Sequence, residues 1–286
     1  LTYEDSDKNY RSTFNQMVQK QTNHLLNEIK NSNEVENKMI GCAAIILCGL
    51  AYKNETNYLE NGLNLLRKII KLSLDNQGFP KSRNIRQLIF YLKYFIIIRE
   101  WFKESQNTIP EYIDETIFYL GSSYAFIWQN IKQDIFFNGN YLSNNEKFDQ
   151  YLKRLGYTFK NEINELTGYI ILKNKKIIFA TDIGSNPTKN FSENYQAGAL
   201  SFEIFSNNKK LITNAGYFSN KKNKLNKLSR STALHSTLVI EDYSSCSFIK
   251  KNSKVFVDKG LKVLKKNIVF ENNYWKISAS HDGYLN

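Results

Sequence analysis

Histidine and cysteine are scarce in this chain of 286 residues, which contains three of each. Cys42, Cys48 and Cys246 form an odd set, and the first two lie six residues apart on a predicted helix, hence on different faces. The cysteines therefore predict neither a disulfide framework nor a zinc motif. The three histidines leave few imidazoles for proton transfer.

Long apolar runs are also missing. The two longest, Met39 to Tyr52 and Leu88 to Ile98, fall short of the roughly 20 residues that cross a bilayer, and Lys93 interrupts the second. Both are typical of buried helices, so we predict no membrane span. The sequence also has no helix-turn-helix motif, Gly-aromatic RNA-binding signature or Cys/His finger, so we predict no nucleic-acid partner.

Positive charge and aromatic residues, by contrast, are abundant. The formal net charge is +12, from 39 basic and 27 acidic residues, and this favours anionic partners. An AT-rich genome would also enrich Lys and Asn, so the charge alone does not choose a partner. The aromatic content of 14% fits an aromatic-lined carbohydrate groove and equally an ordinary core.

The first part of the chain has the apolar spacing of helices. Val35, Met39, Ile46 and Leu50 form one stripe that would face a core. Further helices are predicted at residues 58–74, 86–103 and 110–130. Residues 1–140 are therefore predicted to form helical hairpins.

Beyond a linker at residues 141–165, the apolar period changes from 3.6 to 2. A β-hairpin is predicted at residues 168–181. Further strands are predicted at residues 200–204, 210–213, 237–240, 254–257, 268–270 and 274–279. Many short strands separated by turns indicate an antiparallel β-sandwich at residues 166–286, which gives a two-part α+β chain.

Several short sequence segments resemble those of a known family. In the second part they are Gly168-Tyr169, Asp182-Ile183-Gly184, Ala197 to Glu203, Asn214-Ala215-Gly216, Arg230 to Val239 and His281 to Tyr284. Weaker likenesses lie at residues 33–50, 75–84 and 137–139. Over nearly its whole length the chain resembles the heparinase II/III-like family of polysaccharide lyases.

The resemblance implies a fold, a reaction and a location. The fold would be the last helical hairpins of an incomplete α/α toroid followed by most of the sandwich, with both ends of the chain as truncations of a longer protein. The reaction would be β-elimination on an acidic, uronic-acid polysaccharide, in the periplasm or outside the cell. It needs a group that neutralises the sugar carboxylate, a base for the weakly acidic proton and an acid for the leaving oxygen.

Candidate site residues follow from the resemblance, with the segment Arg230 to Thr237 as the expected centre of the chemistry. The candidate catalytic residues are His235, Tyr195, Asn33 and Tyr284. The candidate substrate-binding residues are Arg230, Arg86, Glu34 and Gln196. Two of them have plainer alternatives, since His235 can be a half-buried structural histidine and Arg230 can hold the loop at residues 217–229.

The chain departs from the family pattern at several positions. Glu34 stands where the family helix usually has a histidine, and Asn194 and Gln196 match a His-x-His motif. The positions that would bind a metal are Gln196, Asn214 and His235, a poor set for zinc. We therefore predict no cofactor and no tightly bound transition metal.

Two functions remain open from the sequence. One is a lyase with a divergent active site. The other is a catalytically degenerate relative that kept the fold and a positive groove for binding glycans. The basic charge serves both equally.

Overall fold

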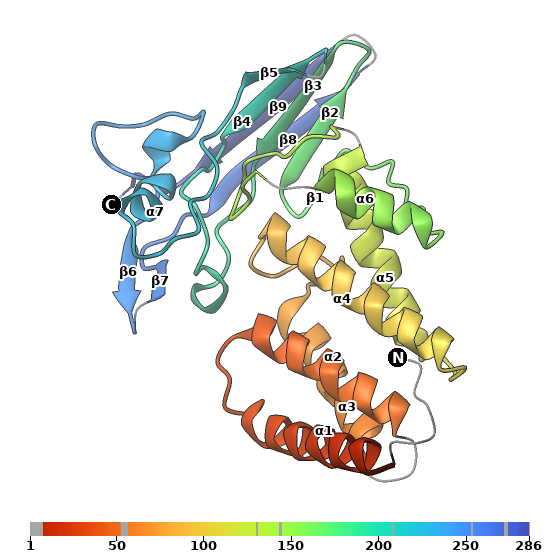
Figure 1. The fold of residues 1–286 in the computed structure, drawn as a ribbon. Helices are drawn as coiled ribbons and strands as arrows, with labels where there is room; N and C mark the ends of the chain where they lie inside the picture. Colours follow the sequence, from red (N-terminus) through yellow and green to blue (C-terminus); the bar gives the residue numbers. More distant parts are fainter. Residues whose placement is uncertain are drawn as a thin grey trace. The chain divides into compact units, whose positions relative to one another are not determined.

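A computed structural model describes residues 8–52, 57–129, 131–142, 145–207, 209–252, 254–271 and 274–285 (Figure 1). The chain forms two compact units. The first consists of Leu1–Leu74 with Tyr91–Ile117, and the second of Asp75–Phe90 with Phe118–Asn286.

The first unit is helical. It contains α1 (Lys8–Glu28), α2 (Val35–Ala51), α3 (Tyr58–Ser73), most of α4 (Ile85–Glu104) and the first part of α5 (Glu111–Tyr124). Ile29, Ile45 and Tyr58 form a buried cluster onto which Leu25 and Leu65 pack, so the first three helices share one core. No described helix is both long and apolar enough to cross a membrane.

Two glycines let α2 and α3 pack closely together. A Cβ atom at Gly49 would lie 2.4 Å from the backbone nitrogen of Leu59, and one at Gly62 would lie 2.6 Å from Ile46. The thiol of Cys42 also donates to the carbonyl of Gly62 over 3.2 Å. Cys42 is buried and unpaired, and burial raises its pKa to about 12.

The second unit opens with short helices. After α5 come the π-helix η1 (Ala125–Gln129) and α6 (Asn145–Arg154), and further on η2 (Lys189–Phe191), α7 (Lys224–Ser229) and η3 (Thr232–Leu234). Helix α6 lies inside the predicted linker, where no helix was expected. The domain boundaries at residues 140 and 165 stay a prediction.

The strands of the second unit form one sheet and two hairpins. The sheet has five antiparallel strands in chain order: β1 (Glu165–Leu166), β2 (Tyr169–Lys173), β3 (Ile177–Asp182), β4 (Phe202–Ser206) and β5 (Lys209–Ile212). The hairpins are β6 (Phe248–Lys251) with β7 (Lys254–Val257), and β8 (Val263–Phe270) with β9 (Trp275–His281).

The β8–β9 hairpin forms the second layer of a sandwich (Figure 1). Ile268 of β8 and Trp275 and Ile277 of β9 pack against a buried cluster that includes Ile170 and Leu172 of β2. The predicted fold class, helical hairpins followed by an antiparallel β-sandwich, is confirmed.

The predicted strand at residues 237–240 is wrong. The N–H of Thr237 bonds back to the carbonyl of His235 in a turn, and its hydroxyl donates to the carbonyl of Ala199. Ile240 forms only an isolated bridge with Tyr243. Turn and side-chain hydrogen bonds therefore take the place of a strand ladder here.

Candidate functional site

A sharp loop at residues 137–140 connects several segments of the second unit. Gly139 has a φ of 80°, which favours glycine, and a Cβ atom there would lie 2.4 Å from the side chain of Asn84. The N–H of Gly139 donates to Oε1 of Gln196 over 3.0 Å. The carbonyl of Asn140 accepts the N–H of Tyr217 over 2.8 Å. The loop thus fixes the positions of Gln196 and Tyr217.

A buried ion pair anchors this loop to the sheet. Nη2 of Arg83 lies 2.6 Å from Oδ1 of Asp182, and Nδ2 of Asn138 donates to Oδ2 of the same carboxylate over 2.6 Å. The hydroxyl of Tyr169 donates to the carbonyl of Arg83, and its ring stacks under the guanidinium at 4.6 Å. Burial lowers the pKa of Arg83, but Asp182, Tyr169 and Tyr195 together outweigh this effect and raise the pKa.

Arg86 lies in the first turn of α4 and is half-buried. Its guanidinium lies 4.8 Å from the ring centre of Tyr141, and Nη1 is 3.4 Å from Oδ1 of Asn145. Oδ1 of Asn84 accepts the backbone N–H of Arg86, so the start of the helix is held next to the loop at residues 137–140. A guanidinium over an exposed tyrosine ring can bind a carboxylate while the ring contacts a sugar.

His235 is buried, with 8% of its surface exposed. Nδ1 lies 2.8 Å from the carbonyl of Ser231, which fixes the proton on Nδ1 and leaves a lone pair on Nε2. Nε2 is buried and has no hydrogen-bond partner among the described residues, and the ring packs on Gly198, where a Cβ atom would lie 2.6 Å from it. Burial lowers the pKa of His235, against the opposing effects of the Ser231 carbonyl and Asp182.

Gln196 and Asn214 are both buried and tie loops together. Nε2 of Gln196 donates to the carbonyl of Ser229 over 2.6 Å, while its Oε1 accepts from Gly139. Oδ1 of Asn214 accepts the N–H of Ser236 over 2.8 Å, and Nδ2 of Asn214 is buried without a partner. Gln196, Asn214 and His235 therefore lie on adjoining loops, and the amides of Gln196 and Asn214 hold these loops together by hydrogen bonds.

A buried carboxylate holds the loop that contains Asn214. Glu203 accepts the N–H groups of Asn214 and Phe136 and the hydroxyl of Thr213, and Lys210 lies 3.6 Å away. Burial raises the pKa of Glu203 and lowers that of Lys210. Lys210 and Phe136 also line a hollow of about 590 Å³.

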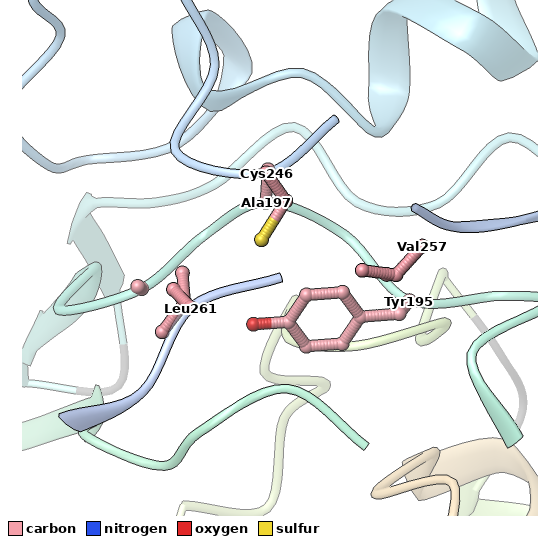
Figure 2. Packing of buried hydrophobic residues seen from close by; sticks show 6 residues of the cluster. Tyr195, Ala197, Cys246, Val257 and Leu261 are labelled. Atoms are coloured by element: carbon pink, nitrogen blue, oxygen red, sulfur yellow. The ribbon is translucent and has the colours of Figure 1, made fainter. Parts of the chain in front are cut away.

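Tyr195 is enclosed by apolar side chains (Figure 2). It is 1% exposed and packs with Ala197, Cys246, Val257 and Leu261. Its hydroxyl is buried without a hydrogen-bond partner, and burial raises its pKa well above the ordinary value. This environment argues against proton exchange with a polysaccharide, and the predicted catalytic role stays untested.

Arg230 is buried and bonded to backbone carbonyls. Nε, Nη1 and Nη2 donate to the carbonyls of Tyr195, Val255 and Ser192 over 2.9–3.1 Å, and the guanidinium lies over the ring of Phe248. Burial lowers its pKa to about 10. These bonds favour a structural role over the predicted contact with a sugar.

The remaining candidates lie elsewhere. The hydroxyl of Tyr284, after β9, donates to the carbonyl of Leu238 over 3.1 Å. Asn33 and Glu34 are exposed in the first unit just before α2, and the Glu34 carboxylate accepts from Asn37 over 2.9 Å.

Two site residues were not identified as a pair from the sequence. The hydroxyl of Tyr217 donates to Oδ1 of Asn194 over 3.0 Å. Asn194 was noted only as a departure from the family pattern, and Tyr217 only as the start of a loop. The Asn-Ala-Gly-Tyr phrase that ends in Tyr217 was the available signal, because a glycine before an aromatic residue can aim a ring from a tight turn.

The second part of the chain is similar to a known family. Residues 165–286 match the model described as the heparinase II/III-like C-terminal domain. Residues 165–286 are therefore similar to the C-terminal domain of the heparinase II/III-like family. No curated protein matches the sequence.

Solved structures extend the likeness in fold to the helices of the chain. A mutant of heparan sulfate lyase HepC from Pedobacter heparinus matches 94% of the chain at 13% identity with a TM-score of 0.71. A heparinase III matches 96% at 15% identity with a TM-score of 0.68, and a second heparinase III gene product matches 93% at 12% identity with a TM-score of 0.73. The chain spans 44–49% of the length of these proteins, and at such identities the likeness is one of fold.

The metal that the family resemblance implies does not fit the side chains present. Both ends of the Gln196 amide and Oδ1 of Asn214 are engaged in hydrogen bonds, so Nε2 of His235 is the one good ligand atom left among the three. Within the described ranges, no group of three or more His, Cys, Asp or Glu side chains could hold a metal ion.

Proposed function

We propose that this protein binds acidic, uronate-containing polysaccharides and cleaves them by β-elimination. The observation that carries the proposal is the family match over residues 165–286, supported by a fold likeness to heparan sulfate lyases that continues through the helices. The net charge of +12 favours a polyanionic chain as the ligand. A periplasmic or extracellular location is part of the proposal, and cell fractionation with an antibody tests it.

In the proposed reaction, Arg86 binds the carboxylate of the sugar. Charge neutralisation makes the neighbouring C–H proton more acidic, so that a base can remove it. Nε2 of His235 carries the lone pair that accepts this proton, since Nδ1 holds its own proton against Ser231. Tyr284 protonates the leaving oxygen at C4. The role of Asn33 in the first unit stays a prediction from the family resemblance.

The first experiment measures product formation. We expect the full-length protein to raise ultraviolet absorbance from unsaturated sugars when it is incubated with a panel of uronate polysaccharides. His235→Ala should remove this activity while the far-ultraviolet circular dichroism stays unchanged, and His24→Ala on α1 is the matched control. Wild-type turnover by His235→Ala would make His235 structural.

The second experiment tests the carboxylate ligand. Arg86→Ala should weaken binding of a uronate oligosaccharide by about tenfold or more, the size expected for a lost charge-assisted hydrogen bond. Arg67→Ala is a matched control, because Arg67 also lies over a tyrosine ring, that of Tyr112, at 4.7 Å. Equal affinities of the two variants would rule out the role of Arg86.

A specific observation favours a second function, glycan binding without cleavage. Tyr195 and His235, two of the three sandwich residues predicted from the sequence as catalytic, are 1% and 8% exposed. Amides occupy positions 194 and 196, and an amide does not exchange protons at neutral pH. Measurable affinity for a uronate glycan with no absorbance change on any polysaccharide would establish the binding function.

A further inference from the structure

Tyr217 is held firmly from both its backbone and its ring. Its N–H donates to the carbonyl of Asn140 over 2.8 Å, and the side chain is 7% exposed. Gly216, with a φ of 79°, brings the chain against Phe136, which lies 3.4 Å from where a Cβ atom would be. These contacts restrict the position of the Tyr217 hydroxyl.

The partner of Tyr217 is the half-buried amide of Asn194. The hydroxyl donates to Oδ1 of Asn194 over 3.0 Å, which fixes how the amide is turned. With Oδ1 occupied, Nδ2 keeps its two N–H groups as donors. The same phenol bond draws electron density from the amide and strengthens it as a donor.

The charges beside Asn194 favour an anion. Its neighbour Glu193 is paired with both Lys221 and Lys254, the latter at 3.0 Å, so this cluster carries one net positive charge. The cluster is partly exposed and belongs to the same compact unit as Arg86. A donor amide next to excess positive charge suits a carboxylate oxygen better than a cation or an apolar group.

We propose that Asn194, oriented by Tyr217, is a specificity-determining residue that binds the carboxylate of a uronate sugar. The inference rests on the proposed function, since the ligand is the same acidic polysaccharide. Asn194 contacts the sugar through Nδ2, and Tyr217 acts as a positioning residue. The pair serves glycan binding whether or not the bound chain is then cleaved.

The test compares affinities of the full-length protein for two probes by calorimetry. One probe is a uronate oligosaccharide that the wild type binds, and the other is the same oligosaccharide with its carboxylates reduced to alcohols. Asn194→Asp keeps the acceptor for Tyr217 but replaces the donor with a negative charge. We expect it to lose at least about tenfold in affinity for the uronate and much less for the reduced probe.

Two further variants separate recognition from folding. Tyr217→Phe keeps the ring and the backbone bond to Asn140, so it should retain the wild-type melting temperature and lose a few-fold in uronate affinity only. Asn15→Asp is the matched control, because the hydroxyl of Tyr52 donates to Oδ1 of Asn15 over the same 3.0 Å in the first unit.

The possible results are distinguishable. Unchanged uronate affinity in Asn194→Asp, or an equal loss for both probes, would overturn the role of Asn194 and leave the proposed function standing. A wild type that binds no uronate polysaccharide would overturn both proposals. A loss confined to the carboxylated probe, with Asn15→Asp unchanged, supports the assignment.

Discussion

The buried ion pair between Arg83 and Asp182 gives the sharpest stability prediction. Asp182→Ala removes a carboxylate that accepts from the guanidinium at 2.6 Å, from Asn138 at 2.6 Å and from the N–H of Gly184 at 2.9 Å. The guanidinium would remain buried with its charge uncompensated. Breaking such a pair from one side costs about 3–5 kcal/mol, which corresponds to a drop in melting temperature of roughly 6–20 °C.

The assay is thermal and urea unfolding of the full-length protein. Asp149→Ala is the matched control, since Asp149 pairs with Lys153 at 2.9 Å on the exposed surface of α6, where a salt bridge is worth about 1 kcal/mol or less. The double variant Arg83→Met/Asp182→Leu should recover part of the loss, because no charge is left buried. If Asp182→Ala melts no lower than Asp149→Ala, the argument from buried charge is refuted.

Three further predictions concern the histidine, the metal positions and the helices. Burial lowers the pKa of His235 below its value in the unfolded chain, so the unfolded state binds the proton first as the pH falls through about 6.5, and the free energy of unfolding decreases. In urea unfolding, His235→Asn should make this decrease smaller. A pH dependence equal to that of the wild type would contradict the argument. Burial lowers the pKa of His281 too, but His281 is present in both the wild type and His235→Asn, so its contribution cancels in the comparison. Elemental analysis should find no stoichiometric zinc in purified protein, because the side-chain oxygens of Gln196 and Asn214 accept hydrogen bonds from backbone N–H groups. One zinc per chain would contradict this prediction. Gly49→Ala should destabilise the helical unit by about 1–3 kcal/mol, since its Cβ meets backbone atoms of α3; a melting temperature equal to wild type would argue against close packing there.

Local patterns in the sequence predicted most of the fold. The hairpin at residues 168–181 and the strand at residues 254–257 contain short runs of β-branched and aromatic residues beside clear turns, and β2, β3 and β7 lie there. Helix α6 is absent from the prediction because it is short and mostly polar, although Phe148, Tyr151 and Leu152 lie at helical spacing on one face. The false strand at residues 237–240 has the right composition, but the side chain of Asn214 accepts the N–H of Ser236, and the hydroxyl of Thr237 donates to the carbonyl of Ala199.

The site was less predictable because distant residues build it. Arg83 and Asp182 are 99 positions apart, and no periodicity or motif links such a pair before the chain is folded. The resemblance predicts a catalytic role for Tyr195, yet Tyr195, Ala197 and Ala199 alternate into one apolar cluster. That alternation was a signal that the tyrosine is a core residue.

The amide side chains of Gln196 and Asn214 set the positions of the loops next to His235 through hydrogen bonds. A metal joins loops by drawing several donors to one point, whereas Gln196 joins Gly139 and Ser229 by accepting at one end and donating at the other. Asn214 fixes the segment next to His235 in the same way. Loop positions are therefore set by hydrogen bonds that do not depend on proton transfer or on a cofactor. The proposed binding of a glycan and its proposed cleavage would then be separable, since Asn194→Asp should impair binding and His235→Ala should impair cleavage.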